Sequence, residues 1–318
     1  MKIATYNVEN LFDLQKSGHE YKEYIPFSQS NWDNRNYKTK LKNLSRVIKD
    51  IDADIIALEE IESKQALDDL KFQLKRDGLY YQYAKIANAK NTTIKVAILS
   101  KFPFVYTKEL VVGYAHSFRN ILEVKLKVNN EDLYIFVNHW KSKAGPESQR
   151  ISYAKTLKKR IQELGNKNII ALGDFNSHYE EYKSFKRKRK LNDTDGITGI
   201  NHILGTINYQ KKSSATQNIK YNELYNLWYD IEENERYSYI YRGKKEALDN
   251  ILISSSLLDH KGIDYKKDSL SNFAPKYLFK GKSIYRWQMS RGKVKKHKAQ
   301  GYSDHLAVIA EFTLGTNQ

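Results

Sequence analysis

Short apolar runs separated by turn residues recur along most of the chain and predict a protein rich in β-strands. The runs at 55–58 and 169–172, both Ile-Ile-Ala-Leu, are typical of buried strands. Between 80 and 138 the runs follow one another with only turns between them, which indicates consecutive antiparallel strands. Strands are predicted at 2–8, 54–58, 80–87, 94–100, 104–112, 119–127, 132–138, 168–172, 237–242, 247–253 and 306–313.

Apolar residues at helical spacing interrupt this pattern. After a polar entry, the segment 31–50 carries Leu41, Leu44 and Ile48 on one face. Pro146, which the first turn of a helix accepts, precedes an apolar face that continues to Gly165. Helices are therefore predicted within 31–50, over 63–76, from 146 to 165 and over 222–231.

Strands outnumber helices, and helices separate only some of them. This balance favours an α/β (α+β) fold of two mainly antiparallel sheets packed face to face, with helices on the outer sides. Neither an internal repeat nor a Pro/Gly/Ser linker divides the chain, so we expect residues 1–318 to form a single domain and a monomer. No run approaches the ~18 apolar residues of a membrane span, so no transmembrane segment is expected.

Positive charge exceeds negative charge. There are 54 Lys and Arg against 37 Asp and Glu, and the net charge of +17 makes an anionic polymer or surface the natural partner. Much of the excess lies in basic surface loops at about 178–220 and 261–300. Aromatic residues alternate with cations in the second loop, as in surfaces that grip phosphates and stack on bases, although a solvated loop would have a similar pattern.

The absence of cysteine limits the possible chemistry of the protein, and the absence of a signal-like region bears on its compartment. The chain has no Cys, which excludes disulfides, thiolate zinc sites and Cys nucleophiles. It enters its first apolar strand at Ile3 without a signal-like region. The expected compartment is the periplasm or exterior if a leader has been removed, and the cytoplasm otherwise.

Polar side chains at the ends of predicted strands suggest a cation site. Asn7 and Glu9 stand two residues apart, hence on one strand face, where an amide oxygen and a carboxylate could bind the same hard cation. Glu59 and Glu60 follow the strand at 54–58, and strand alternation lets only one of them be the ligand. Either could instead be a charge at the rim of the fold.

A second group of polar residues suits phosphate chemistry. Asp174 and Asn176 follow a buried strand and Gly173, and could hold a phosphate oxygen, a water or a metal, or form a capped turn. His139 closes the strand at 132–138 and could equally be a core histidine. Arg119 could clamp a non-bridging phosphate oxygen or be a surface charge.

Asp249 and His305 suggest a water-activating dyad. Asp249 follows Ala247-Leu248, and the pair Asp304-His305 precedes an apolar run. A carboxylate that orients one imidazole nitrogen leaves the other free to accept a proton from water. Whether Asp249 and His305 touch cannot be read from the sequence.

Six motifs, taken in order, resemble the endonuclease/exonuclease/phosphatase superfamily with its DNase I-like fold. They are Tyr6-Asn7-Val8-Glu9, Leu58-Glu59-Glu60, Asn138-His139-Trp140-Lys141-Ser142, Gly173-Asp174-Phe175-Asn176, Leu248-Asp249-Asn250 and Ser303-Asp304-His305. The resemblance spans essentially the whole chain. It implies a four-layered sandwich with these residues at one edge of two central sheets, and cleavage of phosphoester bonds with Mg²⁺, or with Mn²⁺ or Ca²⁺.

The resemblance also implies residue roles. Glu60 would be the main metal carboxylate, helped by Asn7, Glu9 and Asp304. Asp174 and Asn176 would hold the attacking water, the phosphate or a second metal. Asp249 and His305 would form the water-activating dyad. Phosphate contacts would come from Arg119, Lys141, Asn176 and His139.

His139 narrows the branch of the superfamily. The AP-endonuclease branch typically carries a tyrosine there, which disfavours abasic-site repair. Ile94 or its neighbours stand where DNase I has the acidic partner of its leaving-group histidine, so His139 is either a general acid or only a phosphate ligand. The run 138–143 is similar to bacterial extracellular and periplasmic nucleases, and 246–250 does not fit the phosphoinositide phosphatases.

The sequence thus predicts a metal-dependent endonuclease acting on DNA, with RNA as a further candidate substrate and little sequence specificity. One rival is a phospholipid phosphodiesterase such as a sphingomyelinase, in which the loop 270–298 would dock on a membrane. The other is a nucleic-acid or partner-binding protein that has lost catalysis. The second rival is disfavoured because the expected catalytic carboxylates and histidines are present.

Overall fold

The computed structural model describes residues 1–318 apart from 89–91, 115–117, 187–189, 210–219, 221 and 316–318. The longer helices are α1 (Asn34–Ile51), α2 (Lys64–Arg76) and α3 (Glu147–Leu164), with a short α4 (Glu181–Ser184) and a π-helical turn at Gly199–Ile203. The main strands are β1 (Lys2–Leu11), β2 (Ile55–Ile61), β3 (Tyr83–Ile86), β4 (Lys95–Ser100), β5 (Phe104–Leu110), β6 (Ile121–Val128), β7 (Glu131–His139), β8 (Asn168–Asp174), β12 (Asp249–Ile253) and β17 (Val308–Leu314). Shorter strands are β9 (Tyr225–Asn226), β10 (Tyr239–Tyr241), β11 (Lys244–Glu246), β13 (Ile263–Tyr265), β14 (Ser271–Asn272), β15 (Phe279–Lys280) and β16 (Ser283–Ile284).

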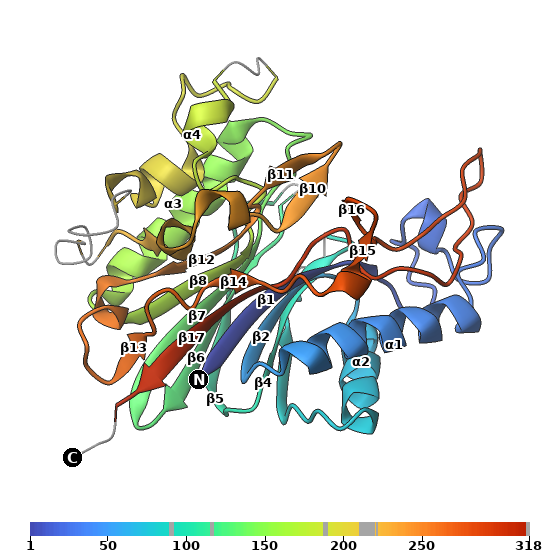
Figure 1. Cartoon of the computed structure of the whole chain (residues 1–318), viewed down its shortest axis with the longest axis horizontal. Helices are drawn as coiled ribbons and strands as arrows, with labels where there is room; N and C mark the ends of the chain where they lie inside the picture. Colours follow the sequence, from blue (N-terminus) through green and yellow to red (C-terminus); the bar gives the residue numbers. More distant parts are fainter. Residues whose placement is uncertain (89–91, 115–117, 187–189, 210–219, 221, 316–318) are drawn as a thin grey trace.

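One sheet joins the two ends of the chain. Its strand order is β13-β17-β1-β2-β4-β3, with β14 added beside β17. The first strand pairs antiparallel with the last, from Lys2 opposite Glu311 to Thr5 opposite Val308, and parallel with β2 (Figure 1). Because β1 and β2 run parallel, their carboxyl ends reach the same edge of the sheet.

The other sheet has the order β5-β6-β7-β8-β12-β9. Here β7 and β8 are the parallel pair, with His139 opposite Asp174, and β12 returns antiparallel so that Asp249 also stands opposite Asp174. This register gathers His139, Asp174 and Asp249 at one edge.

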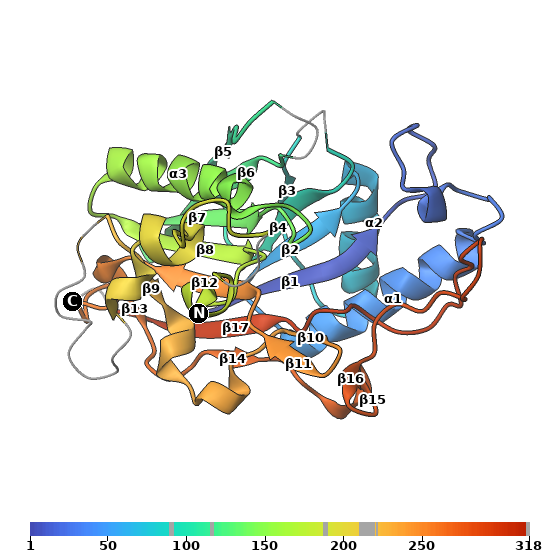
Figure 2. The same cartoon turned by 90° about the horizontal axis from the view of Figure 1, so that it is seen from above.

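The two sheets pack face to face and helices cover their outer sides, which gives four layers (Figure 2). Ile3, Ile55 and Val96 of one sheet meet Val124 and Ile135 of the other in a fully buried core. α1 and α2 lie on the outside of the first sheet, and α3 on the outside of the second. The four-layered DNase I-like sandwich predicted from the sequence is confirmed.

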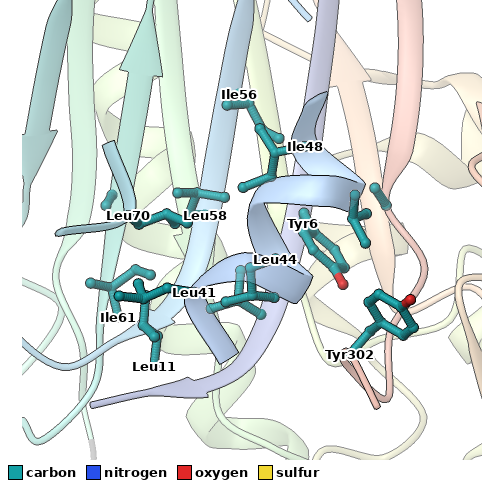
Figure 3. Close-up of a cluster of buried hydrophobic side chains, with 14 of the residues drawn as sticks. Tyr6, Leu11, Leu41, Leu44, Ile48, Ile56, Leu58, Ile61, Leu70 and Tyr302 are labelled. Carbon is teal, nitrogen blue, oxygen red and sulfur yellow. The ribbon is translucent and has the colours of Figure 1, made fainter. Parts of the chain in front are cut away.

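α1 shows how the outer layers are attached. Its N-cap is Asp33, whose side chain accepts a hydrogen bond from the backbone of Asn36. One apolar face then carries Leu41, Leu44 and Ile48 onto the first sheet, where Tyr6 and Leu58 point toward the helix (Figure 3); the helical spacing thus becomes packing against β1 and β2.

One predicted helix is wrong. The segment 222–231 forms β9 and a 3₁₀ turn (Leu227–Asp230) instead of an α-helix. Its apolar residues do not form one face, since Tyr225, Leu227, Trp228 and Tyr229 are all buried. Asn226 accepts a hydrogen bond from the backbone of Trp228, and the indole of Trp228 donates to the carbonyl of Asp249; these contacts hold the segment at the sheet edge.

The predicted basic loops are partly structured. The region 178–220 carries α4 and the π-helical turn, with 187–189 and 210–219 outside the described residues, and 261–300 carries β13 to β16. Within the described residues, no helix is long and apolar enough to cross a membrane.

Candidate active site

A cavity of about 690 Å³ opens at the edge where the strands of both sheets end. Most of the predicted site residues lie on its wall, although they are spread over the whole sequence. Those lining the cavity are Glu9, Glu60, Arg119, His139, Asp174, Asn176, Asp304 and His305.

Glu60 and Asp174 meet across the two sheets through Asn7. The amide Nδ2 of Asn7 donates to Oε1 of Glu60 at 3.2 Å and to Oδ2 of Asp174 at 3.1 Å. Glu60 has a left-handed backbone (φ 67°), at a shift in the pairing of β2 with β4. Glu59 takes the other direction: it is fully buried and accepts a hydrogen bond from Thr5 at 2.9 Å. Only Glu60 of the pair therefore faces the cavity.

The carboxylates of this wall are held close together in a poorly solvated place. The pKa of Asp174 is raised to about 7, mainly by burial and secondly by the negative charge of Asp249. Burial, and next the charge of Asp304, raises the pKa of Glu60. Carboxylates that are costly to ionise together attract a cation, because an added positive charge removes their mutual repulsion.

Asp249 and His305 are in contact. The Nδ1 atom of His305 lies 2.7 Å from Oδ2 of Asp249, and both residues are buried. Burial lowers the pKa of His305, but the charge of Asp249, its hydrogen bond and the charges of Asp174 and Asp304 together outweigh burial and raise this pKa well above its usual value. The ring of Tyr239 packs beside the imidazole, with ring centroids 4.9 Å apart.

Asn176 and Arg119 add hydrogen-bond donors to the cavity. Asn176 has a left-handed backbone (φ 47°); its Nδ2 donates to the carbonyl of Trp140 at 3.1 Å and to Asp174 at 3.2 Å. The guanidinium of Arg119 donates to the same carbonyl at 3.2 Å. Both side chains are thus held by the loop after β7.

His139 is buried beside the carboxylates. Its Nε2 lies 3.6 Å from Oδ2 of Asp174 and 3.8 Å from Oε1 of Glu60. Its Nδ1 is buried and has no hydrogen-bond partner among the described residues, and Ile94 lines the same cavity. The pKa of His139 lies well below the usual value, mainly because of burial and secondly because of the positive charge of Arg119, so the imidazole is neutral. No described carboxylate orients its second nitrogen.

Glu9 and Asp304 face a cation that the sequence motifs did not reveal. Arg286, from the loop after β16, donates from Nε to Oε1 of Glu9 at 2.8 Å and also contacts that oxygen through Nη2. The same nitrogen lies 3.3 Å from Oδ2 of Asp304. Its position within a run of basic residues gave no signal that this arginine, among many, reaches the cavity.

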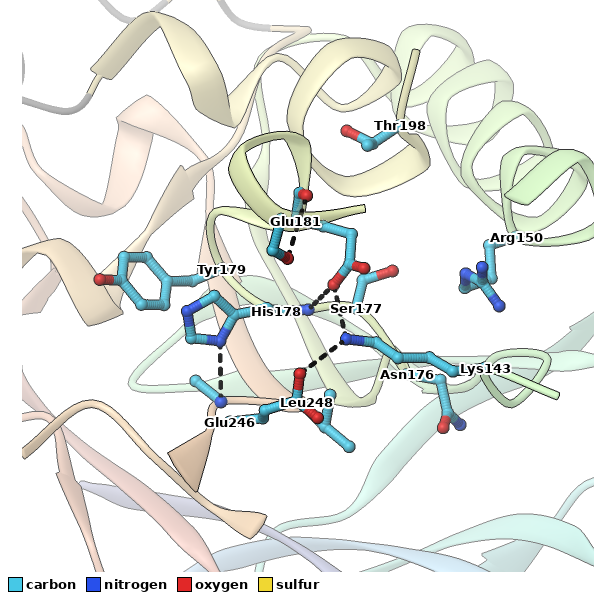
Figure 4. Close-up of polar contacts among 12 residues, drawn as sticks. Lys143, Arg150, Asn176, Ser177, His178, Tyr179, Glu181, Thr198, Glu246 and Leu248 are labelled. Atoms are coloured by element: carbon cyan, nitrogen blue, oxygen red, sulfur yellow. Dashed lines mark hydrogen bonds and ion pairs between the residues drawn. The ribbon is translucent and has the colours of Figure 1, made fainter. Parts of the chain in front are cut away.

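Lys143 lines the cavity, whereas Lys141 does not. Figure 4 shows the ammonium group of Lys143 pointing toward Glu181 and Glu246, at 2.7 Å and 3.3 Å. His178 accepts a hydrogen bond at Nδ1 from the backbone of Ala247, just ahead of Asp249. The Asn-His-Trp-Lys-Ser-Lys run therefore sends its second lysine to the site, where it ties together α4 and the end of β11.

The donor set fits a hard divalent cation. Glu60, Asp174 and Asp304 offer carboxylate oxygens at one cavity. Asn7 turns its amide nitrogen to Glu60 and Asp174, and its Oδ1 accepts a hydrogen bond from the backbone of Glu9 at 3.0 Å. Asp174, Asp249 and His305 also have ligand atoms within 4.8 Å of one another, so this group too could hold an ion.

Comparison with known proteins agrees with this geometry. The model of the Endonuclease/Exonuclease/phosphatase family matches residues 2–217 and 191–313, and the chain belongs to this family. No curated protein matches the sequence.

Solved structures share the fold at low identity. A TDP2 from D. rerio in complex with single-strand DNA product aligns over 98% of each chain with a TM-score of 0.59 and 13% identity. A mannosyl-6-phosphatase from Bacteroides thetaiotaomicron aligns over 99% of this chain and 100% of its own, with a TM-score of 0.59 and 13% identity. An endonuclease/exonuclease/phosphatase family protein from the same organism aligns over 99% of this chain and 98% of its own, with a TM-score of 0.57 and 14% identity. At these identities the likeness concerns the fold.

Proposed function

We propose that the protein is a divalent-metal-dependent endonuclease that hydrolyses phosphodiester bonds of DNA, with RNA as a further candidate substrate and little sequence specificity. The observation that carries the proposal is the hydrogen bond of 2.7 Å between Asp249 and His305, beside the Glu60 and Asp174 carboxylates in one open cavity. Membership of a family of nucleases and phosphatases supports the reaction class.

His305 is the proposed general base. Asp249 holds its Nδ1–H, which leaves Nε2 directed to other partners, and no described residue is hydrogen-bonded to that atom. Nε2 accepts a proton from the attacking water, and the resulting imidazolium is stabilised by Asp249. Only the neutral imidazole can accept a proton, so the rate is expected to rise with pH.

The proposed phosphate contacts come from Arg119, Asn176 and His139, which line the same cavity. Arg119 and Asn176 donate hydrogen bonds to non-bridging oxygens as negative charge grows, and neutral His139 supports the same oxygens. Removal of one such donor should slow the reaction roughly a hundredfold. A divalent ion held by Glu60 would supply charge neutralisation at the phosphate and the leaving oxygen. Asn7 would join its ligands by turning its amide oxygen from the backbone of Glu9 toward the ion.

Affinity for a polymer is assigned to the basic loops. Residues 291–296, in the loop that carries Arg286, are all exposed and include Arg291, Lys293, Lys295 and Lys296. Such cations position a polyanion through its phosphates without reading bases. The net charge of +17 favours this class of substrate over a small phosphorylated sugar.

The test compares substrates under one set of conditions. Supercoiled plasmid, single-stranded RNA, sphingomyelin vesicles and mannose 6-phosphate are offered with Mg²⁺, Mn²⁺, Ca²⁺ or chelator, and products are quantified. We expect metal-dependent nicking of the plasmid that is lost in His305→Ala. Turnover of vesicles or of the sugar phosphate with an intact plasmid would replace the proposal with a lipid phosphodiesterase or a phosphatase. Binding of DNA without any turnover would indicate the inactive binding protein.

A further inference from the structure

Arg286 occupies the space between two carboxylates predicted as metal ligands. Its guanidinium contacts Oε1 of Glu9 through both Nε and Nη2, and Nη2 lies 3.3 Å from Oδ2 of Asp304. The other oxygen of Glu9 accepts a hydrogen bond from the backbone of Trp287 at 2.9 Å. Both oxygens of the Glu9 carboxylate are therefore engaged by this chain itself.

The backbone of Arg286 is held in place from several sides. A Cβ at Gly301 (φ +87°) would lie 1.9 Å from the carbonyl oxygen of Arg286, so the two segments approach as closely as glycine allows. Trp287 is buried, and its indole donates to His297 at 2.8 Å. The side chain of Arg286, in contrast to its backbone, is 52% exposed and lines the cavity.

A second buried cation supports the same corner. Lys40 is fully buried; its ammonium group donates to the carbonyls of Glu9 at 3.0 Å and Tyr302 at 2.8 Å. It also lies 5.2 Å from the centre of the Trp287 ring. The Glu9 side of the cavity is thus rich in built-in positive charge.

The Glu60 side differs. The hydrogen-bond donors to Glu60 and Asp174 among the described residues are the amides of Asn7 and Asn176 and the backbone N–H of Asn176. No Lys or Arg of the described chain forms an ion pair with either carboxylate. Arg119 and His305 act on these carboxylates through their charge without an ion pair to Glu60 or Asp174, so a divalent ion can still approach, whereas Arg286 already bridges Glu9 and Asp304.

We propose that Arg286 is the resident counter-cation of Glu9 and Asp304, so that the divalent ion is confined to the Glu60 side and Glu9 positions Arg286 instead of binding metal. An ion between Glu9 and Asp304 would have to break charge-assisted hydrogen bonds and lie beside a guanidinium that repels it. The inference rests on the proposed metal-dependent site, but not on which substrate the protein cleaves.

The experiment counts Mn²⁺ ions bound per chain from the electron paramagnetic resonance signal of free Mn²⁺, without substrate. We expect one ion for the wild type and two for Arg286→Met, because Glu9 and Asp304 are then uncompensated. The charge-balanced double variant Glu9→Gln/Arg286→Met should return to one ion. Its affinity should change by less than the roughly 10–100-fold that loss of a ligand-supporting residue causes.

Several outcomes decide the matter. A second ion in the wild type that is lost in Glu9→Gln, or no additional ion in a folded Arg286→Met, would overturn the role of Arg286. A second ion that Glu9→Gln leaves in place belongs to the group of Asp174, Asp249 and His305. If circular dichroism shows that Arg286→Met does not fold, the double variant Glu9→Gln/Arg286→Met is the deciding one. Loss of the bound Mn²⁺ in this double variant would make Glu9 a metal ligand, and retention of the Mn²⁺ supports the proposal. Glu60→Gln should bind no ion. An ion retained in Glu60→Gln would instead refute the metal site of the proposed function, which keeps the two failures distinct.

Discussion

The Nδ1 atom of His305 lies 2.7 Å from Oδ2 of Asp249, although the two residues are carried by strands of different sheets or by the segment leading into one. Asp249 begins β12 of the second sheet, and His305 directly precedes the apolar run into β17 of the first. The dyad therefore depends on how the two sheets pack. A change in sheet packing should disturb this pair before it affects either sheet alone.

Asp249→Asn should slow hydrolysis by about 10²–10⁴-fold with little change in KM, because the imidazole loses the carboxylate that orients it and stabilises its charge. Single-turnover cleavage of the preferred substrate measures the effect. The chain offers a matched control in Asp264, which lies 3.1 Å from His260 at a surface site where His260 is 90% exposed. Asp264→Asn should leave the rate unchanged. Equal losses in both variants would show that a general structural effect, and not the dyad, was measured.

Much of this arrangement could be predicted from the sequence because the chemistry lies at strand ends. Apolar runs fix where strands end, and strands of one sheet end at shared edges. That argument places Glu60, Asp174 and Asp249 beside predicted strands, and the family resemblance implies that they share one edge. Strand patterns alone do not place the two sheets relative to each other, and Glu60 lies in a different sheet from Asp174 and Asp249. The contact of Asp249 with His305 required that packing.

Other features lie beyond local pattern. The helix predicted at 222–231 fails because apolar residues that fit a helix also fit a short edge strand and a turn buried on all sides. Arg286 is one cation in a long basic segment, and only the close approach at Gly301 and the pairing with Glu9 single it out. Strand alternation predicts that Asn7 and Glu9 share one strand face. Glu9 has a left-handed backbone (φ 51°), so regular alternation does not hold at this position.

The metal-free protein should be destabilised by the buried carboxylates of the proposed active site. The folded-state pKa of Asp174, about 7, exceeds the value of 3.8 for an unperturbed Asp. Its contribution to stability is therefore fully present below pH ~4 and is lost as pH rises through about 7. In chelator, Asp174→Asn should raise the melting temperature at pH 8 relative to the wild type, and the difference should shrink at pH 5. Each unit of pKa difference corresponds to about 1.4 kcal/mol.

Added Mg²⁺ should act in the opposite sense. An ion that binds only the folded state stabilises it, so Mg²⁺ should raise the melting temperature of the wild type more than that of Asp174→Asn at pH 8. Thermal unfolding with and without Mg²⁺ provides the measurement. A wild type more stable than Asp174→Asn at pH 8 in chelator would contradict the repulsion argument.

Gly173 should not tolerate a side chain. It has φ +132°, and a Cβ would lie 2.0 Å from the carbonyl oxygen of Asn138 on the adjacent parallel strand. Gly173→Ala should cost roughly 3–5 kcal/mol, the sum of a strained backbone and a clash that flexible atoms cannot relieve. Gly78 is the control, since it also has a positive φ (+91°) but nothing within 4 Å of its Cβ position. Gly78→Ala should cost only about 1–2 kcal/mol. Chemical denaturation of both variants tests the difference, and similar costs would mean that the strands can separate.

Binding of DNA should depend on lysines of the loop that carries Arg286. Lys293 and Lys296 are exposed, and removing one lysine that neutralises a phosphate should reduce the slope of log affinity against log salt by about 0.9 on duplex DNA. The double variant Lys293→Ala/Lys296→Ala should therefore bind more weakly at low salt and show a slope flatter by up to about 1.8. Lys155 and Lys159 on α3 are equally exposed and serve as the matched pair, because their replacement removes the same net charge. Fluorescence anisotropy at several salt concentrations distinguishes the two. An equal change of slope in both pairs would show that net charge alone attracts the DNA, and an unchanged slope in both would place the phosphate-binding cations elsewhere.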